Sequence, residues 1–281
     1  MSIDIETSFV AGTPRLAFDH LGSGDPVIFL HGIGGNRTNW ATQLPVFARH
    51  FHAIAWDARG WGLSDDYEGP LHFENFSEDL LRLMEHFHLH TAHFVGLSMG
   101  GLILQDFIGR HPERIRTLVL ADTSRGPLDD HDEAWVDEFL AMRKKPLLEG
   151  KSTRDIAPWV ARALAGPQAS PETLQVLAQS IADLHPDSYL KAMDCVMRYR
   201  IPTDRSRIQV PVLVLVGDED RLTPVAAARS LAGSIPTSHL VTLPGAGHLA
   251  NIEQPAAFNQ TVLEFLLQPH ADGGGGGKQG G

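Results

Sequence analysis

The sequence lacks several features that would place the protein outside the ordinary globular class. It contains one cysteine, Cys195, so an internal disulfide is excluded and a reducing, cytoplasmic location is expected. No apolar run reaches the roughly 18 residues that a membrane-spanning helix needs. Residues 1–15 include acidic side chains and lack a basic start followed by an apolar segment. We therefore expect neither a membrane partner nor a secretory signal.

Basic residues are also scarce, with 23 Lys and Arg against 34 Asp and Glu and a net charge of −11. A nucleic-acid partner is not expected, because binding to phosphates needs a basic face. The balance remains compatible with a small anionic substrate held by one or two arginines. A length of 281 residues indicates one or two domains. The composition does not indicate an oligomeric state.

Short apolar runs alternate with amphipathic helical patterns along much of the chain. The runs are nearly continuous and rich in β-branched residues, as strands buried on both faces are. Helices are expected to begin near Ser77 and at Pro255. The expected strands are 26–31, 52–57, 92–97, 115–122, 210–218 and 239–244. The alternation predicts an α/β fold with a mostly parallel central sheet and helices on both faces.

The alternation stops between about residues 126 and 204, where helical patterns follow one another without a strand. Residues 1–125 and 205–270 are therefore predicted to form the α/β core, and residues 126–204 a helical cap, or lid. An insertion at the carboxyl ends of the strands lies where open sheets bind ligands. Residues 271–281 are glycine-rich, which predicts a disordered tail.

One glycine-bounded serine marks a candidate reaction centre. Ser98 stands between Gly96 and Gly100, directly after an expected strand and directly before a helical pattern. Such a turn is strained and exposes the hydroxyl, and it needs small neighbours two residues away on each side. The amino end of the following helix can stabilise negative charge. Ser98 is therefore predicted to be a nucleophile.

A serine nucleophile needs a base and an acid that orients the base. His248 lies in a glycine-rich loop between the last expected strand and the last helix, and it is the preferred base. Asp220 follows a buried strand and is the preferred acid, with Asp122 as the alternative. The oxyanion would be held by the backbone amides of Met99, the residue after the nucleophile, and Ile33, in the loop after strand 26–31.

A metal site is a separate possibility. His86 and His90 are four residues apart and could share a helix face, with His93 nearby. No acid or cysteine is placed to complete such a site with them, so no metal and no other cofactor is expected. Four tryptophans are candidates for a pocket lining or for plain core packing: Trp40, Trp61, Trp135 and Trp159.

With these residues identified, the chain resembles the α/β-hydrolase superfamily over nearly its whole ordered length. Within that superfamily, residues 247–266 and 188–204 resemble 3-oxoadipate enol-lactonases and related esterases. The resemblance implies Ser98 as nucleophile, Asp220 as acid and His248 as base. The motifs that carry it are HGIGG at 31–35, DARGWGLSD at 57–65, GLSMGG at 96–101, GDEDRLTP at 217–224 and GAGHLANIEQPAAF at 245–258.

The expected function is that of a serine hydrolase that cleaves a small-molecule carboxylic ester or lactone by acyl transfer. A carbon–carbon bond hydrolase or a cofactor-free perhydrolase would share the same three residues. A receptor that binds a ligand without turning it over is a further alternative. Serine at position 98 argues against a dehalogenase, whose alkyl-enzyme intermediate needs a carboxylate.

Overall fold

The computed structural model describes residues 5–269, so the predicted tail at 271–281 lies outside the described residues. One eight-stranded sheet runs through the molecule in the order β1-β2-β4-β3-β5-β6-β7-β8. The strands are β1 (Ser8–Val10), β2 (Leu16–Gly22), β3 (Pro26–Leu30), β4 (His52–Trp56), β5 (Ala92–Leu97), β6 (Ile115–Ala121), β7 (Val212–Gly217) and β8 (Ser238–Leu243). The strands from β3 onward pair in parallel, whereas β2 is antiparallel to both β1 and β4. The mostly parallel sheet is therefore confirmed.

Helices connect the strands. The α-helices are α1 (Leu44–Phe47), α2 (Glu74–His86), α3 (Met99–Arg110), α4 (Pro127–Asp130), α5 (Glu133–Leu148), α6 (Thr153–Leu164), α7 (Pro171–Ala182), α8 (Pro186–Arg198), α9 (Val225–Gly233), α10 (Ala250–Glu253) and α11 (Pro255–Leu266). Short 3₁₀ turns are η1 (Arg37–Trp40), η2 (Pro112–Arg114) and η3 (Arg205–Arg207). Within the described residues, no helix is long and apolar enough to cross a membrane.

The direction of each crossover decides which face of the sheet a helix covers. The chain moves one way along the sheet from β3 through α1 to β4, and the opposite way from β4 through α2 to β5. Because such crossovers are right-handed, α1 and α2 must cover opposite faces. Consistently, α1 contacts α11, whereas α2 contacts α3. Helices thus cover both faces, as the alternation of strands and helices predicted.

Two local expectations were wrong or incomplete. The helix expected near Ser77 begins at Glu74, and Ser77 is buried inside it, where its hydroxyl donates to Asp106 on α3 at 3.0 Å. Ser77 therefore links two helices and does not cap one. The strands β1 and β2 were not predicted; they form the antiparallel edge of the sheet, where strands are shorter or less continuously buried.

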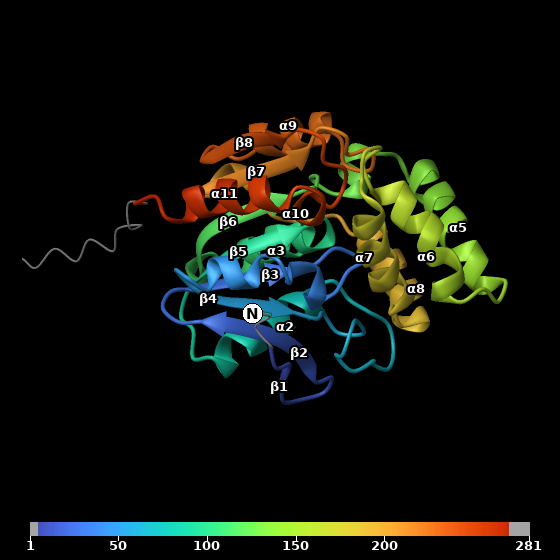
Figure 1. Ribbon diagram of the computed structural model, residues 1–281, viewed down its shortest axis with the longest axis horizontal. Helices are drawn as coiled ribbons and strands as arrows, with labels where there is room; N and C mark the ends of the chain where they lie inside the picture. Colours follow the sequence, from blue (N-terminus) through green and yellow to red (C-terminus); the bar gives the residue numbers. More distant parts are fainter. Residues whose placement is uncertain (1–4, 270–281) are drawn as a thin grey trace, which may run out of the picture.

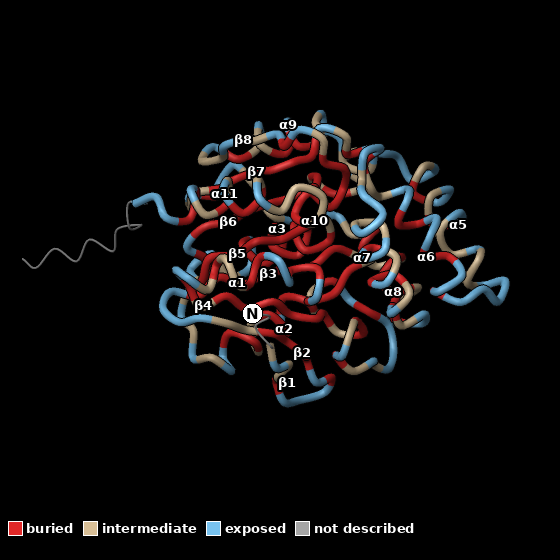
Figure 2. Tube along the Cα trace, viewed as in Figure 1, coloured by how far each residue is buried: buried red, intermediate tan, exposed pale blue. Residues whose placement is uncertain are grey.

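Five helices, α4 to α8, follow one another between β6 and β7, and we refer to them as the inserted helices. Figure 1 shows α5 to α8 gathered at one end of the sheet. Figure 2 shows that the strands are mostly buried, whereas the outer parts of the inserted helices are exposed. The carboxyl ends of the parallel strands β3, β5, β6, β7 and β8 lie on the same side of the sheet. The loops that follow these strands therefore converge there.

Candidate active site

Ser98 occupies a strained turn between β5 and α3. Its backbone has φ 53° and ψ −114°, in the left-handed half of φ that non-glycine residues rarely adopt. A Cβ added at Gly96 would lie 2.5 Å from the carbonyl oxygen of Gly100 across the turn. A Cβ at Gly100 would lie 2.4 Å from the carbonyl oxygen of Leu30 on β3. The second glycine is thus required by the neighbouring strand as well as by the tight turn.

The structure brings Ser98, His248 and Asp220 together although 150 residues separate the first two. The Ser98 Oγ lies 2.9 Å from the His248 Nε2, and the His248 Nδ1 lies 2.9 Å from the Asp220 Oδ2. His248 and Asp220 are almost completely buried, at 3% and 4% exposed. Because the carboxylate can only accept, the Nδ1 carries the proton and the Nε2 is free to accept from the serine hydroxyl.

Asp220 and His248 each shift the pKa of the other. Burial by itself lowers the pKa of His248, but the charge and hydrogen bond of Asp220 outweigh it, so the pKa is raised above its ordinary value of 6.5. Burial by itself raises the pKa of Asp220, but His248 and Thr223 outweigh it, so that pKa is lowered. Asp220 is therefore ionised at neutral pH and stabilises the protonated form of His248.

Thr223, which is not among the site residues expected from the sequence, forms a further hydrogen bond to Asp220. Its hydroxyl donates to the Asp220 Oδ2 at 2.7 Å and lies 3.3 Å from the His248 Nδ1. The backbone amides of Leu222 and Thr223 donate to the other carboxylate oxygen at 2.8 and 2.9 Å. The signal was present in the segment that follows Asp220, since Asp and Thr three residues apart commonly form such a turn.

Asp122, the alternative acid, lies close to the same site but faces other groups. Its Oδ1 accepts from the backbone amide of Gly217 at 2.9 Å, and its Oδ2 accepts from that of Ala250 at 3.0 Å. It is completely buried and has a φ of 44°. Burial and the nearby Asp220 charge raise its pKa well above the ordinary value. Asp122 therefore ties together the two loops that carry Asp220 and His248, and it does not orient the imidazole.

The loop after β3 faces the serine from the other side. Ile33 and Met99 both line the cavity that contains Ser98. The His31 Nε2 accepts from the backbone amide of Ala58 at 3.0 Å, so its Nδ1 carries the proton and donates to the Gly32 carbonyl at 2.8 Å. The Trp61 indole donates to the Ile33 carbonyl at 3.0 Å. The peptide groups around Ile33 are thus held by a buried histidine and a buried tryptophan.

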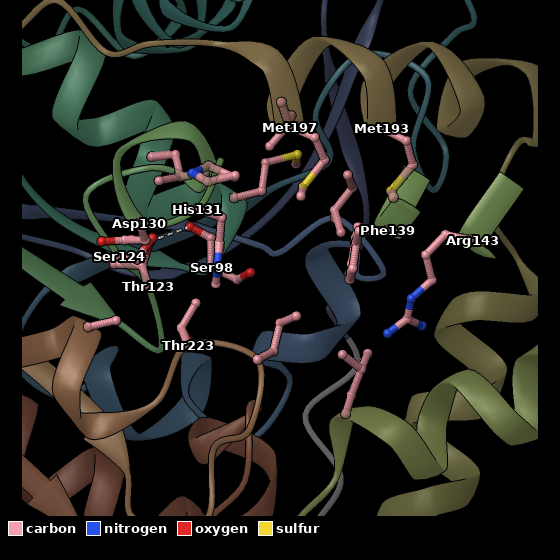
Figure 3. Close-up of a pocket in the computed structure, with 18 of the residues that line it drawn as sticks. Ser98, Thr123, Ser124, Asp130, His131, Phe139, Arg143, Met193, Met197 and Thr223 are labelled. Carbon is pink, nitrogen blue, oxygen red and sulfur yellow. Dashed lines mark hydrogen bonds between the residues drawn. The ribbon is translucent and has the colours of Figure 1, made fainter. Parts of the chain in front are cut away.

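Two cavities meet at Ser98. The larger has a volume of about 360 Å³ and is lined by core loops and inserted helices together; Figure 3 shows Phe139, Met193 and Met197 around it. The smaller, of about 30 Å³, is lined by Ser98 and His248 among others. Of the four candidate tryptophans, Trp135 alone lines the larger cavity. Trp40 and Trp61 are core residues, and Trp159 on α6 does not line either cavity.

The histidine cluster considered as a metal site is not assembled. His86 ends α2 and packs its ring against Phe18 and Phe87. His93 lies on β5, with its Nδ1 2.8 Å from the Thr117 hydroxyl. Among residues 5–269, no three His, Cys, Asp or Glu side chains are placed to hold a metal ion. These histidines therefore do not come together as a three-ligand cluster in this part of the chain.

Comparison with known proteins agrees with this architecture. Residues 25–255 match the alpha/beta hydrolase fold family, and the chain belongs to that family. A relative named 3-oxoadipate enol-lactonase 2, from Acinetobacter baylyi, is 30% identical over 84% of this chain and 86% of its own length. The solved structure of a thermophilic esterase from Thermogutta terrifontis has a TM-score of 0.81 and 29% identity, covering 94% of this chain and 98% of that one. The enol-lactonase of Burkholderia xenovorans has a TM-score of 0.82 and 26% identity, covering 94% and 100%.

Proposed function

We propose that this protein is a carboxylic ester hydrolase that cleaves a small ester or lactone through an acyl-enzyme formed on Ser98. The observation that carries the proposal is the continuous chain of hydrogen bonds from Ser98 through His248 to Asp220, with two spacings of 2.9 Å. This arrangement is that of a nucleophile, a base and an orienting acid. The family membership and the likeness to proteins named lactonase and esterase support the same reaction class.

In the proposed mechanism, the His248 Nε2 takes the hydroxyl proton as the Ser98 Oγ attacks the carbonyl carbon. The carbonyl oxygen becomes an oxyanion and accepts hydrogen bonds from the backbone amides of Ile33 and Met99. Asp220 stabilises the imidazolium that forms. His248 then gives the proton to the leaving oxygen as the carbon–oxygen bond breaks. In the second half, His248 takes a proton from water, the hydroxide adds to the acyl carbon, and Ser98 regains its proton as the acid leaves.

The two cavities support different places for the two halves of an ester. The leaving oxygen must receive its proton from His248, which lines the small cavity of about 30 Å³. That space holds one or two water-sized groups, which favours a small alcohol. The acyl group would then occupy the cavity of about 360 Å³. Within residues 126–204, α5, α6 and α8 contribute to its lining, so we propose that this segment acts as a cap over the core of residues 1–125 and 205–270.

The experiment is a kcat/KM comparison across aryl esters, small alkyl esters and lactones, with wild type and Ser98→Ala. Removing the hydroxyl should reduce kcat/KM by about 10⁴-fold or more without unfolding the protein, because the covalent step is lost. Intact mass spectrometry after mixing with an aryl ester should show an acylated wild-type chain and an unmodified variant. A variant that retains nearly full activity would refute the proposal.

The same assay separates the alternatives that share these residues. Replacing part of the water with hydrogen peroxide should divert the acyl-enzyme to a peracid only in a perhydrolase. A carbon–carbon bond hydrolase would leave all the esters and lactones intact but cleave a diketone. A receptor would be stabilised thermally by one of the compounds and release no product.

A further inference from the structure

The larger cavity beside Ser98 is lined by an arginine, Arg143, that forms no ion pair within residues 5–269. Arg143 on α5 lines this cavity and is half-buried. Its guanidinium carbon lies 5.2 Å from the ring centre of Phe139 and 5.5 Å from that of Trp159. Its Nε is buried and has no hydrogen-bond partner. Aromatic rings stabilise a cation without satisfying its N–H donors, so these donors remain available to a ligand.

Three other ionisable side chains line the cavity: Asp130, His131 and Tyr189. The Asp130 Oδ1 lies 3.6 Å from the Arg125 guanidinium, whereas its Oδ2 is buried and has no hydrogen-bond partner among the described residues. His131 is stacked on Trp135 at 3.7 Å between ring centres. No carboxylate among residues 5–269 forms an ion pair with Arg143, and burial lowers its pKa, opposed only by Tyr189. Desolvation of a cation is unfavourable unless an anion accompanies it. The lining therefore favours an anionic group at this position.

Arg143 and Ser98 lie at different ends of the cavity. In Figure 3 the guanidinium is at the end away from Ser98, with Phe139 between them. Met193 and Met197 line the same space, so the region between the two polar ends is apolar. An acyl group that reaches from the serine to the arginine would need an apolar middle and an anionic end. The planar guanidinium fork matches the two oxygens of a carboxylate.

We propose that Arg143 is a specificity-determining residue that binds a carboxylate at the far end of the acyl group. The preferred substrates are then short-alcohol monoesters of linear dicarboxylic acids. This inference rests on the proposed ester hydrolysis at Ser98, and it adds the chemical class of the acyl group. Because the serine and the arginine are fixed on different elements, one chain length of the diacid should fit best.

The first test uses matched pairs of methyl esters. Monomethyl succinate through monomethyl suberate are compared with neutral esters in which an isopropyl group replaces the terminal carboxylate. Wild type should prefer the anionic ester by about 10- to 100-fold in kcat/KM at the best chain length, the effect of one charged hydrogen-bonding pair. Equal or faster hydrolysis of every neutral ester would overturn the proposal while leaving ester hydrolysis itself intact.

The second test assigns that preference to one side chain. Arg143→Met should reduce the ratio of anionic to neutral kcat/KM by about 10- to 100-fold, and Arg143→Lys should restore part of it, because a lysine keeps the charge but not the fork. Lys145→Met is the matched control: Lys145 is on the same helix but 71% exposed, and it should leave the ratio unchanged. A ratio that is the same in Arg143→Met and wild type would overturn the assignment.

A binding measurement keeps this test independent of turnover. Monomethyl adipate is titrated by calorimetry into Ser98→Ala and into the double variant that also carries Arg143→Met. The dissociation constant should rise at least about tenfold when the guanidinium is removed. Equal binding to both proteins would overturn the role of Arg143 whatever the catalytic assays show. If Arg143-dependent binding is found but wild type cleaves no ester, the proposed function fails and the carboxylate site stands.

Discussion

The core loops at the strand ends and the inserted helices line the same cavity but hold their side chains in different ways. In the core, Ser98, Asp220 and His248 are fixed by directional hydrogen bonds and by a strained turn. On the inserted helices, Met193 and Met197 meet the cavity through apolar packing. Directional bonds fix reaction geometry within a narrow range, whereas packing only requires shape and volume. The chemistry should therefore depend on the core, and substrate choice on the inserted helices.

The largest effect is expected when the hydrogen-bond chain of the core is disrupted. Asp220→Asn removes the charge that stabilises the His248 imidazolium and favours the wrong tautomer, so kcat/KM should fall by about 10⁴-fold. Asp218→Asn is the matched control, because Asp218 is exposed and its oxygen can still accept from the Gly245 amide as asparagine. Steady-state kinetics on one aryl ester, with circular dichroism as the folding check, measures both. A loss below tenfold in Asp220→Asn would contradict the role given to this carboxylate.

The next effect concerns the stability of the serine turn. Gly100→Ala places a Cβ 2.4 Å from the Leu30 carbonyl, on backbone that cannot move easily, so the free energy of unfolding should fall by about 3 kcal/mol. Gly233→Ala, at the end of α9, meets no atom within 4 Å and should be neutral or slightly stabilising. Urea unfolding of both variants gives the difference. Equal stability would show that the turn has more room than the structure indicates.

A smaller effect is the pH dependence of the reaction. His248 acts as a base only when neutral, and its pKa is raised above 6.5, so the acid limb of kcat/KM should lie above pH 6.5. At pH values below the His248 pKa, kcat/KM should fall about tenfold per pH unit, because His248 must lose one proton before it can act as a base. The limb should move to lower pH in Asp220→Asn, since the charge that raises the pKa is gone. A limb at the same pH in both proteins would contradict the coupling.

The smallest expected effect tests the inserted helices. Met193→Ala enlarges the cavity, so the preference for methyl hexanoate over methyl acetate in kcat/KM should change by about tenfold. Met142→Ala is the same substitution on a 54% exposed side chain of α5, and it should leave that preference unaltered. If Met193→Ala changes kcat/KM for methyl hexanoate and for methyl acetate by the same factor, the substitution has caused a general loss of structure. A thermal unfolding curve distinguishes that outcome.

Much of the fold followed from local pattern. Nearly continuous apolar runs predicted the five strands from β3 to β7, because a strand buried on both faces has little room for polar residues. The strand β8 was also expected, but it lies at the end of the sheet and is only partly buried. The sequence pattern does not predict the antiparallel strands β1 and β2, since β2 becomes more exposed toward its end and β1 has three residues. The sequence around Ser77 predicts a helix cap, because its hydrogen bond to Asp106 depends on a second helix that the local sequence does not show.

In the candidate site, too, some residues could be predicted from the sequence and others could not. Ser98 and its glycines could be identified from the sequence, because backbone geometry in a tight turn constrains residues two positions away. The sequence favours Asp220 over Asp122 because Asp220 stands in a loop between a buried strand and a helix, but Asp122 also follows a strand. Both follow strands that end at the same edge of the sheet, and only the packed loops show that Asp122 faces two amides while Asp220 faces the imidazole.

The sequence by itself determined the class of fold and the residues with reactive potential, because turn geometry and strand burial act over a few positions. The tertiary structure alone decided which tryptophan reaches the cavity, which carboxylate meets His248, and that Arg143 lines the cavity without an acidic partner in the described part of the chain. Those facts depend on contacts between segments far apart in the chain. Local periodicity carries no information about which of several helices packs over which loop, so the side chains that face the cavity are decided only in the folded molecule.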